Sequence, residues 1–267
     1  MWTIFWRTLK DRRILLLIYT LSSIALLWMY IALFPSFKDQ SASLEALIKN
    51  YPESFLKAFN FDIKSFTTLE GYLATEQFSF VWPIMVIFMT IGFSGSALAG
   101  EIEKGTIEIL LSQPISRAKL FFSRYLAGLL MLILFVIFSV FSVLPLSLAY
   151  NISFSSENFM TMAVLGLMFS AAIYSIGIFL SSVFSDKGKV FFISGGLLVG
   201  MYVLNILSAL KENLSDLKYF SFFYYFNPAK ALIYQQIDPW AYGVFLGVTF
   251  VLTTLGLIIF SRRDIAT

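Results

Sequence analysis

The chain has 267 residues, of which 58% are hydrophobic and 13% charged, and its mean hydropathy is +0.81. Soluble domains carry about a quarter charged residues, so this composition excludes a water-soluble fold and requires lipid around part of the surface. The net charge of +3 is small and the basic residues are dispersed, which argues against nucleic-acid binding. The chain has no Cys and no His, which excludes disulfides, thiolate metal sites and imidazole chemistry.

Residues 1–13 predict an amphipathic helix that lies on the membrane surface and enters the first span. At helical spacing its aromatic residues fall on one face, with charges elsewhere. The residues concerned are Trp2, Phe5, Trp6, Arg7, Arg12 and Arg13.

Six apolar segments are each long enough to cross a bilayer, which takes about 20 helical residues. They predict an all-α, polytopic membrane protein with a single transmembrane domain over residues 1–267. The predicted spans are 14–34, 78–99, 121–150, 159–184, 190–210 and 240–260.

Two longer connections lie on one side of these spans. Residues 35–77 carry apolar residues at helical spacing, which predicts one or two short amphipathic helices on the outer leaflet. Residues 211–239 are aromatic around 220–226, a pattern typical of anchoring at the membrane interface. The spaced apolar residues of the first connection are Leu44, Leu47, Ile48, Tyr51, Phe55, Leu56 and Phe59.

The distribution of Lys and Arg predicts the orientation. Both termini, the loop after the second span and the loop after the fourth span hold 12 basic and 6 acidic residues, whereas the remaining connections hold 7 basic and 10 acidic residues. Basic loops stay in the cytoplasm. We therefore expect a multi-pass plasma-membrane protein with both termini cytoplasmic.

The cores of the spans contain one ionisable residue, Arg124, near a cytoplasmic end. Proton relays and intramembrane enzymes need acids, bases or histidines at membrane depth. Sodium coupling through backbone carbonyls and hydroxyls stays open. Two G-x-x-x-G spacings, Gly196/Gly200 and Gly243/Gly247, fit either a subunit contact or packing inside the chain.

The loop after the second span reads E-I-E-K-G-T-I-E-I-L-L-S-Q-P-I-S-R over residues 101–117. Thr106 predicts a helix cap, and Ile107, Leu110 and Leu111 form one apolar face. Pro114 ends this helix and Ser116 caps the next one. Such a helix can dock into a groove on another protein or rest on the lipid surface.

This stretch resembles the signature of permease subunits of the type-2 ABC exporter family, in the six-helix branch associated with multi-copper enzyme maturation. The resemblance implies a coupling helix that contacts a cytoplasmic ABC ATPase, and residues 1–13 resemble the N-terminal elbow helix of the family. The residues of the implied coupling segment are Glu101, Glu103, Lys104, Gly105, Thr106, Glu108, Leu110, Leu111, Pro114, Ser116 and Arg117.

The same resemblance implies an exporter permease that works as a homo- or heterodimer. The chain has no G-x-x-x-x-G-K-[ST] phosphate loop, so we expect ATP and magnesium on a separate ATPase, and neither catalysis nor a metal site on this chain. Two alternatives remain: an ATP-independent channel or sodium-coupled secondary transporter, and a membrane enzyme or scaffold.

Overall fold

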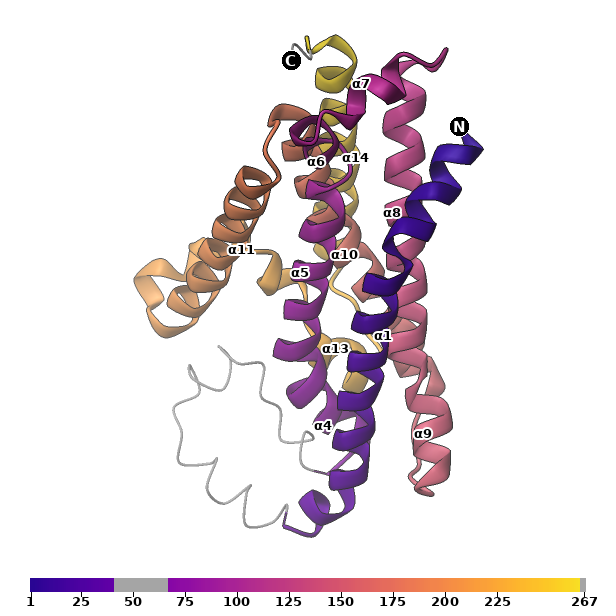
Figure 1. Cartoon of the computed structure of the whole chain (residues 1–267). Coiled ribbons are helices and arrows are strands. Elements are labelled where there is room, and N and C mark those ends of the chain that lie inside the picture. The colour runs from indigo at the N-terminus through magenta and orange to yellow at the C-terminus, as the bar shows by residue number, and fades with distance from the viewer. Residues whose placement is uncertain (41–66, 265–267) are drawn as a thin grey trace.

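A computed structural model defines residues 1–40 and 67–264, and all regular structure in these residues is helical (Figure 1). Six helical stretches are long and apolar enough to cross a membrane, which confirms the predicted six-span, all-α architecture. Four are single helices: α1 (Trp2–Asp39), α10 (Ser156–Val183), α11 (Lys187–Leu210) and α14 (Pro239–Arg262).

The other two spans are composite. The second joins α4 (Leu69–Leu73), the π-helix η2 (Ala74–Val81) and α5 (Trp82–Gly95), and the third joins α8 (Arg117–Phe141) and α9 (Val143–Ala149). Short helices form the connections. They are α6 (Ala99–Glu103), α7 (Thr106–Leu111), the 3-10 helix η3 (Glu212–Phe220), α12 (Phe222–Tyr225) and α13 (Pro228–Tyr234).

The predicted helix boundaries at the start of the chain are wrong. One helix runs from Trp2 to Asp39 without a break at residue 13, because no Gly or Pro precedes Pro35. The connection predicted from residue 35 is therefore shorter, and the second span begins at Leu69. The amphipathic helices predicted around residues 44–59 lie outside the described residues.

The core is centred on α10. In its most apolar window 72% of the residues are buried, compared with 17% in α11 and in α14. Helices α5, α8 and α14 pack against it. The fully buried Trp82 of α5 donates a hydrogen bond to Ser139 Oγ (2.9 Å), and its ring packs beside Phe135 and Phe226.

The aromatic connection between α11 and α14 contributes to this core. Phe222, Tyr225 and Phe226 are buried, and the ring centroid of Phe226 lies 4.2 Å from that of Phe169. The prediction of interface anchoring is therefore wrong for these three residues, because α12 and the residue after it pack against the core. Phe220 remains exposed.

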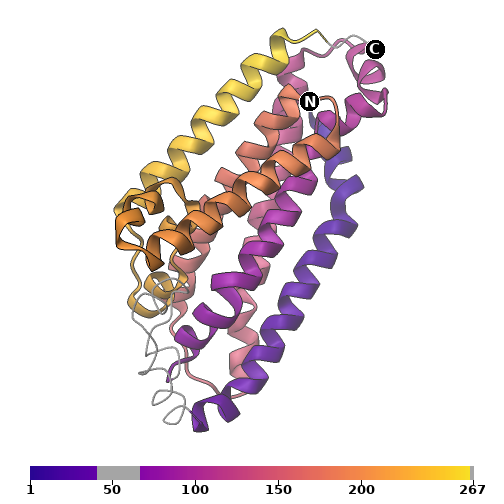
Figure 2. The ribbon, with the colours of Figure 1, turned by 90° about the vertical axis from the view of Figure 1, so that its left-hand side faces the viewer.

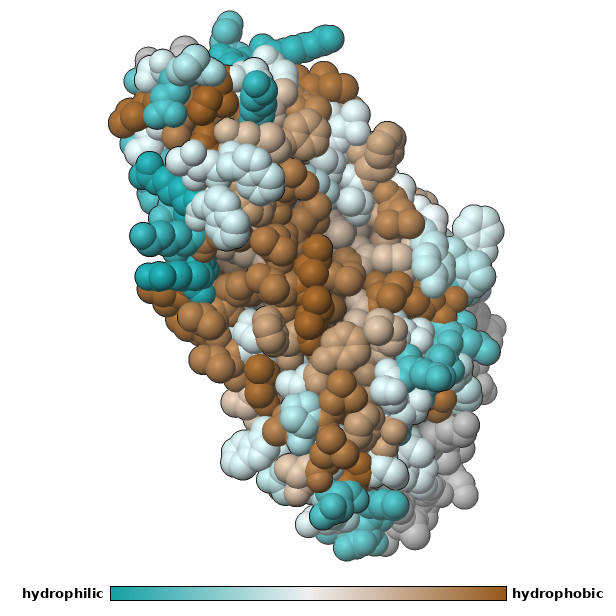
Figure 3. Space-filling view, turned by 90° about the vertical axis from the view of Figure 1, so that its right-hand side faces the viewer, coloured by the Kyte–Doolittle hydropathy of each residue, from teal (hydrophilic) through white to brown (hydrophobic). Residues whose placement is uncertain are grey.

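Helix α11 lies obliquely across one side of the bundle (Figure 2). Between it and α5 is an apolar groove of about 430 Å³ that includes Phe88, Phe191 and Gly196. The side of the molecule that faces the viewer in Figure 3 carries a broad hydrophobic band with hydrophilic residues at its ends. These surfaces are what a multi-pass membrane protein presents to lipid or to another apolar protein surface.

Candidate functional site

The segments predicted to share one side of the membrane meet at one end of the bundle, which we call the terminal end (Figure 1). Arg263 after α14 donates to the backbone oxygens of Ser182 (3.1 Å) and Phe184 (3.2 Å) at the end of α10. Arg117 at the start of α8 donates to the backbone oxygen of Arg263. Burial lowers the pKa of the Arg263 guanidinium from its usual value.

The turn between α6 and α7 depends on a glycine. Gly105 has φ +69°, in the left-handed region that side chains disfavour, and it is the residue that caps α7. Thr106 is the first helical residue, so the prediction that it caps the helix is wrong. Its hydroxyl instead donates back to α6, to Glu101 Oε2 at 2.5 Å and to the Glu101 carbonyl at 3.2 Å.

The apolar face of α7 points toward the chain's own bundle. Ile107 is buried, and Leu110 and Leu111 are half-buried against the core. A short amphipathic helix at the end of a bundle packs its apolar stripe against that bundle, and the contact of this segment with an ATPase stays a prediction. The outward side instead presents Ile109, 66% exposed, beside the exposed Glu108.

The rest of the predicted coupling segment is distributed around this turn. Glu103 Oε2 accepts the backbone N–H of Lys187, the first residue of α11, at 2.9 Å. The predicted cap of α8 is confirmed, since Ser116 Oγ accepts the N–H of Lys119 (3.3 Å). Lys104 and Pro114 are exposed.

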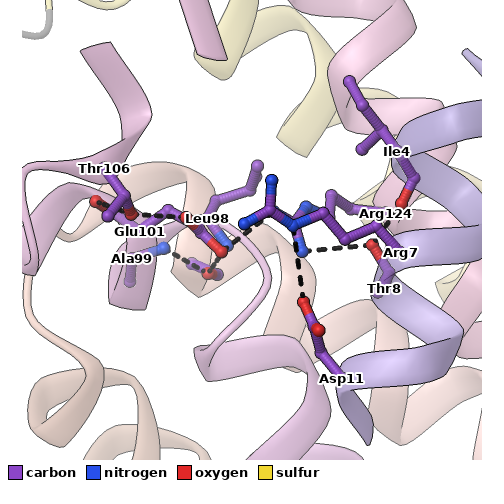
Figure 4. Close-up of polar contacts among 10 residues, drawn as sticks. Ile4, Arg7, Thr8, Asp11, Leu98, Ala99, Glu101, Thr106 and Arg124 are labelled. Carbon is purple, nitrogen blue, oxygen red and sulfur yellow. Dashed lines mark hydrogen bonds and ion pairs between the residues drawn. The ribbon is translucent and has the colours of Figure 1, made fainter. Parts of the chain in front are cut away.

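An ion pair between the buried Arg124 and the partly buried Glu101 anchors this turn to the bundle (Figure 4). Arg124 of α8 is 7% exposed, and its Nη2 donates to Glu101 Oε1 at 2.9 Å. Its Nη1 donates to Thr8 Oγ1 of α1 at 3.1 Å, and Tyr174 of α10 donates to its backbone oxygen at 3.3 Å. Charge-assisted bonds of this kind are strong where water is excluded.

A second anchor ties the start of α6 to α10. Ser181 Oγ accepts the backbone N–H groups of Leu98 (3.3 Å) and Ala99 (2.9 Å). Ser181, like Thr8, Arg124 and Tyr174, is not among the predicted site residues. Arg124 alone has a signal in the sequence, as the only charge inside a predicted span.

Most of the predicted elbow residues stay apart from this site. Trp2 and Trp6 are largely exposed on α1, and Arg7 lies 3.9 Å from Asp11 on the surface of the same helix. Arg12 is the exception, because it lines a small cavity together with Arg124. Phe5 is partly buried and Arg13 is exposed.

The site holds few groups for chemistry. Among residues 1–40 and 67–264, no group of three or more His, Cys, Asp or Glu side chains is placed to hold a metal ion. What the arrangement offers is a short helix, α7, with one exposed side, joined through α6 and Arg124 by hydrogen bonds to α1, α8, α10 and α11. This geometry suits the transfer of a mechanical load.

Two comparisons with known proteins bear on this arrangement. The family model described as ABC-2 family transporter protein matches residues 2–265, nearly the whole chain. A search of curated proteins finds no match.

Proposed function

The chain belongs to the ABC-2 transporter family and is thus a membrane permease component of an ABC transporter, and we propose that it is the permease of an exporter driven by a separate ATPase subunit. The family implies association with such an ATPase and with the membrane. We further propose that the ATPase binds ATP and magnesium and docks at the terminal end. That end then faces the cytoplasm of a plasma-membrane protein, as the distribution of Lys and Arg favours.

The observation that carries the docking proposal is the outward side of α7. Ile109 is 66% exposed on α7, at the terminal end of the molecule. Glu108, one residue earlier on α7, and Lys104 and Glu103, just before this helix, are also exposed, so polar groups accompany Ile109 in this segment. An apolar anchor within a polar rim is the usual arrangement of an interface hot spot.

The dimer proposal draws on the flank formed by α5 and α11. Their groove is apolar, and a Cβ atom added at Gly196 or Gly200 would meet no atom within 4 Å. A second permease subunit could therefore approach α11 closely. In the proposed mechanism, closure of two ATPase subunits on ATP moves both α7 helices, and the spans follow between inward-open and outward-open states.

Co-purification of the chain from native membranes in mild detergent tests the proposal, with the ATPase identified by its nucleotide hydrolysis. We expect Ile109→Ala to lower ATPase affinity by about tenfold or more, since truncation of a hot-spot anchor costs about 2 kcal/mol. The matched control is Leu148→Ala, which truncates a similarly exposed side chain (68%) on α9 at the opposite end.

Recovery of no ATPase with the unaltered chain would contradict the proposal. So would equal ATPase binding by the Ile109→Ala and Leu148→Ala variants. Transport that persists in ATP-depleted vesicles would favour a channel or a sodium-coupled carrier instead.

A further inference from the structure

We infer that Glu101 is a positioning residue whose carboxylate makes α7, α8 and α1 move as one unit. The inference deepens the proposed function and rests on it, because the motion to be transmitted is that of an ATPase docked on α7. Glu101 lies in α6, five residues before the start of α7. Its carboxylate is engaged by Thr106 and Arg124 within the chain, so its role differs from docking.

The two carboxylate oxygens of Glu101 bind two different elements. Oε2 accepts the hydroxyl of Thr106 at the start of α7 (2.5 Å), and Oε1 accepts Nη2 of Arg124 in α8 (2.9 Å). A single rigid planar group thus connects the docking helix to a membrane span. Thr106 also bonds the Glu101 carbonyl, so α7 cannot rotate about Gly105 without breaking these contacts.

Arg124 extends the connection to further helices. Its other terminal nitrogen donates to Thr8 Oγ1 (3.1 Å), and the Thr8 hydroxyl donates to the Ile4 carbonyl within α1 (2.8 Å). Tyr174 of α10 donates to the backbone oxygen of Arg124 (3.3 Å). Displacement of α7 therefore pulls on α8 and α1 through one continuous set of polar contacts.

Burial makes this connection stiff. Arg124 is 7% exposed, and among the described residues Glu101 is the acid that lies within ion-pair distance of its guanidinium. A buried ion pair adds little net stability, but removal of one partner leaves an uncompensated charge. The pair is thus better suited to fixing a geometry than to stabilising the fold.

Glu103 provides an internal comparison. It is also an acid of α6 that binds another helix, since it accepts the backbone N–H of Lys187. Its contact is exposed, however, and involves no buried charge. If burial of the ion pair creates the stiffness, neutralising Glu103 should leave α7 fixed to α8.

Spin-label distances in the permease–ATPase complex test the inference. The chain has no native cysteine, so a label pair at Ser112→Cys after α7 and Ile133→Cys on α8 needs no background removal. In the native sequence we expect a narrow distance distribution that keeps its mean when a non-hydrolysable ATP analogue and magnesium are added. In Glu101→Gln we expect the distribution to broaden and its mean to shift with nucleotide.

The double variant Glu101→Gln/Arg124→Gln separates positioning from stability. We expect it to recover thermal stability in detergent relative to Glu101→Gln, because the buried Arg124 charge is removed together with its partner. Gln at position 124 is too short to reach residue 101. In the double variant, as in Glu101→Gln, we therefore expect nucleotide to shift the mean distance between the labels on α7 and α8. Recovery of the narrow distribution together with stability would overturn the inference.

Two more outcomes would overturn it: an unchanged distribution in Glu101→Gln, or the same broadening in the Glu103→Gln control. If no ATPase binds the native chain, the proposed function fails separately. The comparison of distribution widths in the isolated native and Glu101→Gln chains still tests the connection between α7 and α8, with equal widths counting against it.

Discussion

Glycines occupy two contrasting environments in this molecule. In the core, a Cβ atom at Gly128 of α8 would lie 2.1 Å from the Tyr174 hydroxyl, and one at Gly177 of α10 would lie 2.0 Å from Ser94 Oγ. On the flank, Gly200 of α11 and Gly243 of α14 face open space, with nothing within 4 Å. The same residue type therefore brings helices together in one region and leaves a close-approach surface unoccupied in the other.

This difference bears on the two G-x-x-x-G spacings, Gly196/Gly200 and Gly243/Gly247, which fit either a subunit contact or packing inside the chain. Among the described residues, a Cβ atom added at any of these four glycines would meet no atom within 4 Å, which argues against packing inside the chain for both pairs. The glycines that do pack internally, such as Gly128 and Gly177, have no such spacing. The glycines of α11 and α14 are therefore open to a neighbouring molecule, as the proposed dimer requires, whereas Gly128 and Gly177 leave room for the side chains opposite them.

Gly128→Ala should give the largest effect. The added methyl group overlaps the fully buried Tyr174, whose ring is held beside Tyr125 and cannot move away. Overpacking of this kind costs about 1–3 kcal/mol. The measurement is the midpoint of thermal denaturation in detergent. A midpoint equal to that of the native chain would show that the close contact at Gly128 does not require a glycine.

Gly177→Ala should destabilise somewhat less, because the small Ser94 side chain opposite it can rotate or shift. We expect a loss of about 1–2 kcal/mol. Combination with Ser94→Gly removes both overlapping atoms and should restore most of the lost midpoint. A double variant no better than Gly177→Ala would show that the clash is not the cause.

Gly200→Leu should leave the stability of the single chain close to native, because its side chain enters open space. If α11 seats a second permease, the same change should shift the equilibrium from dimer to monomer. Light scattering or cross-linking in detergent measures this shift. An unchanged dimer fraction would place the subunit contact elsewhere.

Gly243→Ala should have the smallest effect, and in the opposite direction. Alanine is preferred over glycine in helices by up to about 1 kcal/mol, and no neighbour opposes the methyl group. We expect a slightly raised denaturation midpoint in detergent. A lowered midpoint would mean that α14 contacts another part of the molecule at this position.

The sequence predicts the spans well because apolar runs report membrane crossing directly, and Ser116 is correctly predicted as a cap because capping is local. It does not predict the partner of Arg124, since Glu101 lies 23 positions away and only the bundle brings the two together. The direction of the α7 apolar face is also a property of the bundle. Its residue spacing alone is equally compatible with a partner protein and with the chain's own core.

The contacts of Arg263 have a practical consequence for experiments on the purified protein. This residue joins the last helix to the end of α10 and accepts a bond from Arg117 at the start of α8. An affinity tag fused directly after residue 262 would remove Arg263 and leave the backbone oxygens of Ser182 and Phe184 without this donor. Tags and reporter domains should therefore follow residue 264, preferably through a flexible spacer, so that purification does not itself loosen the surface under study.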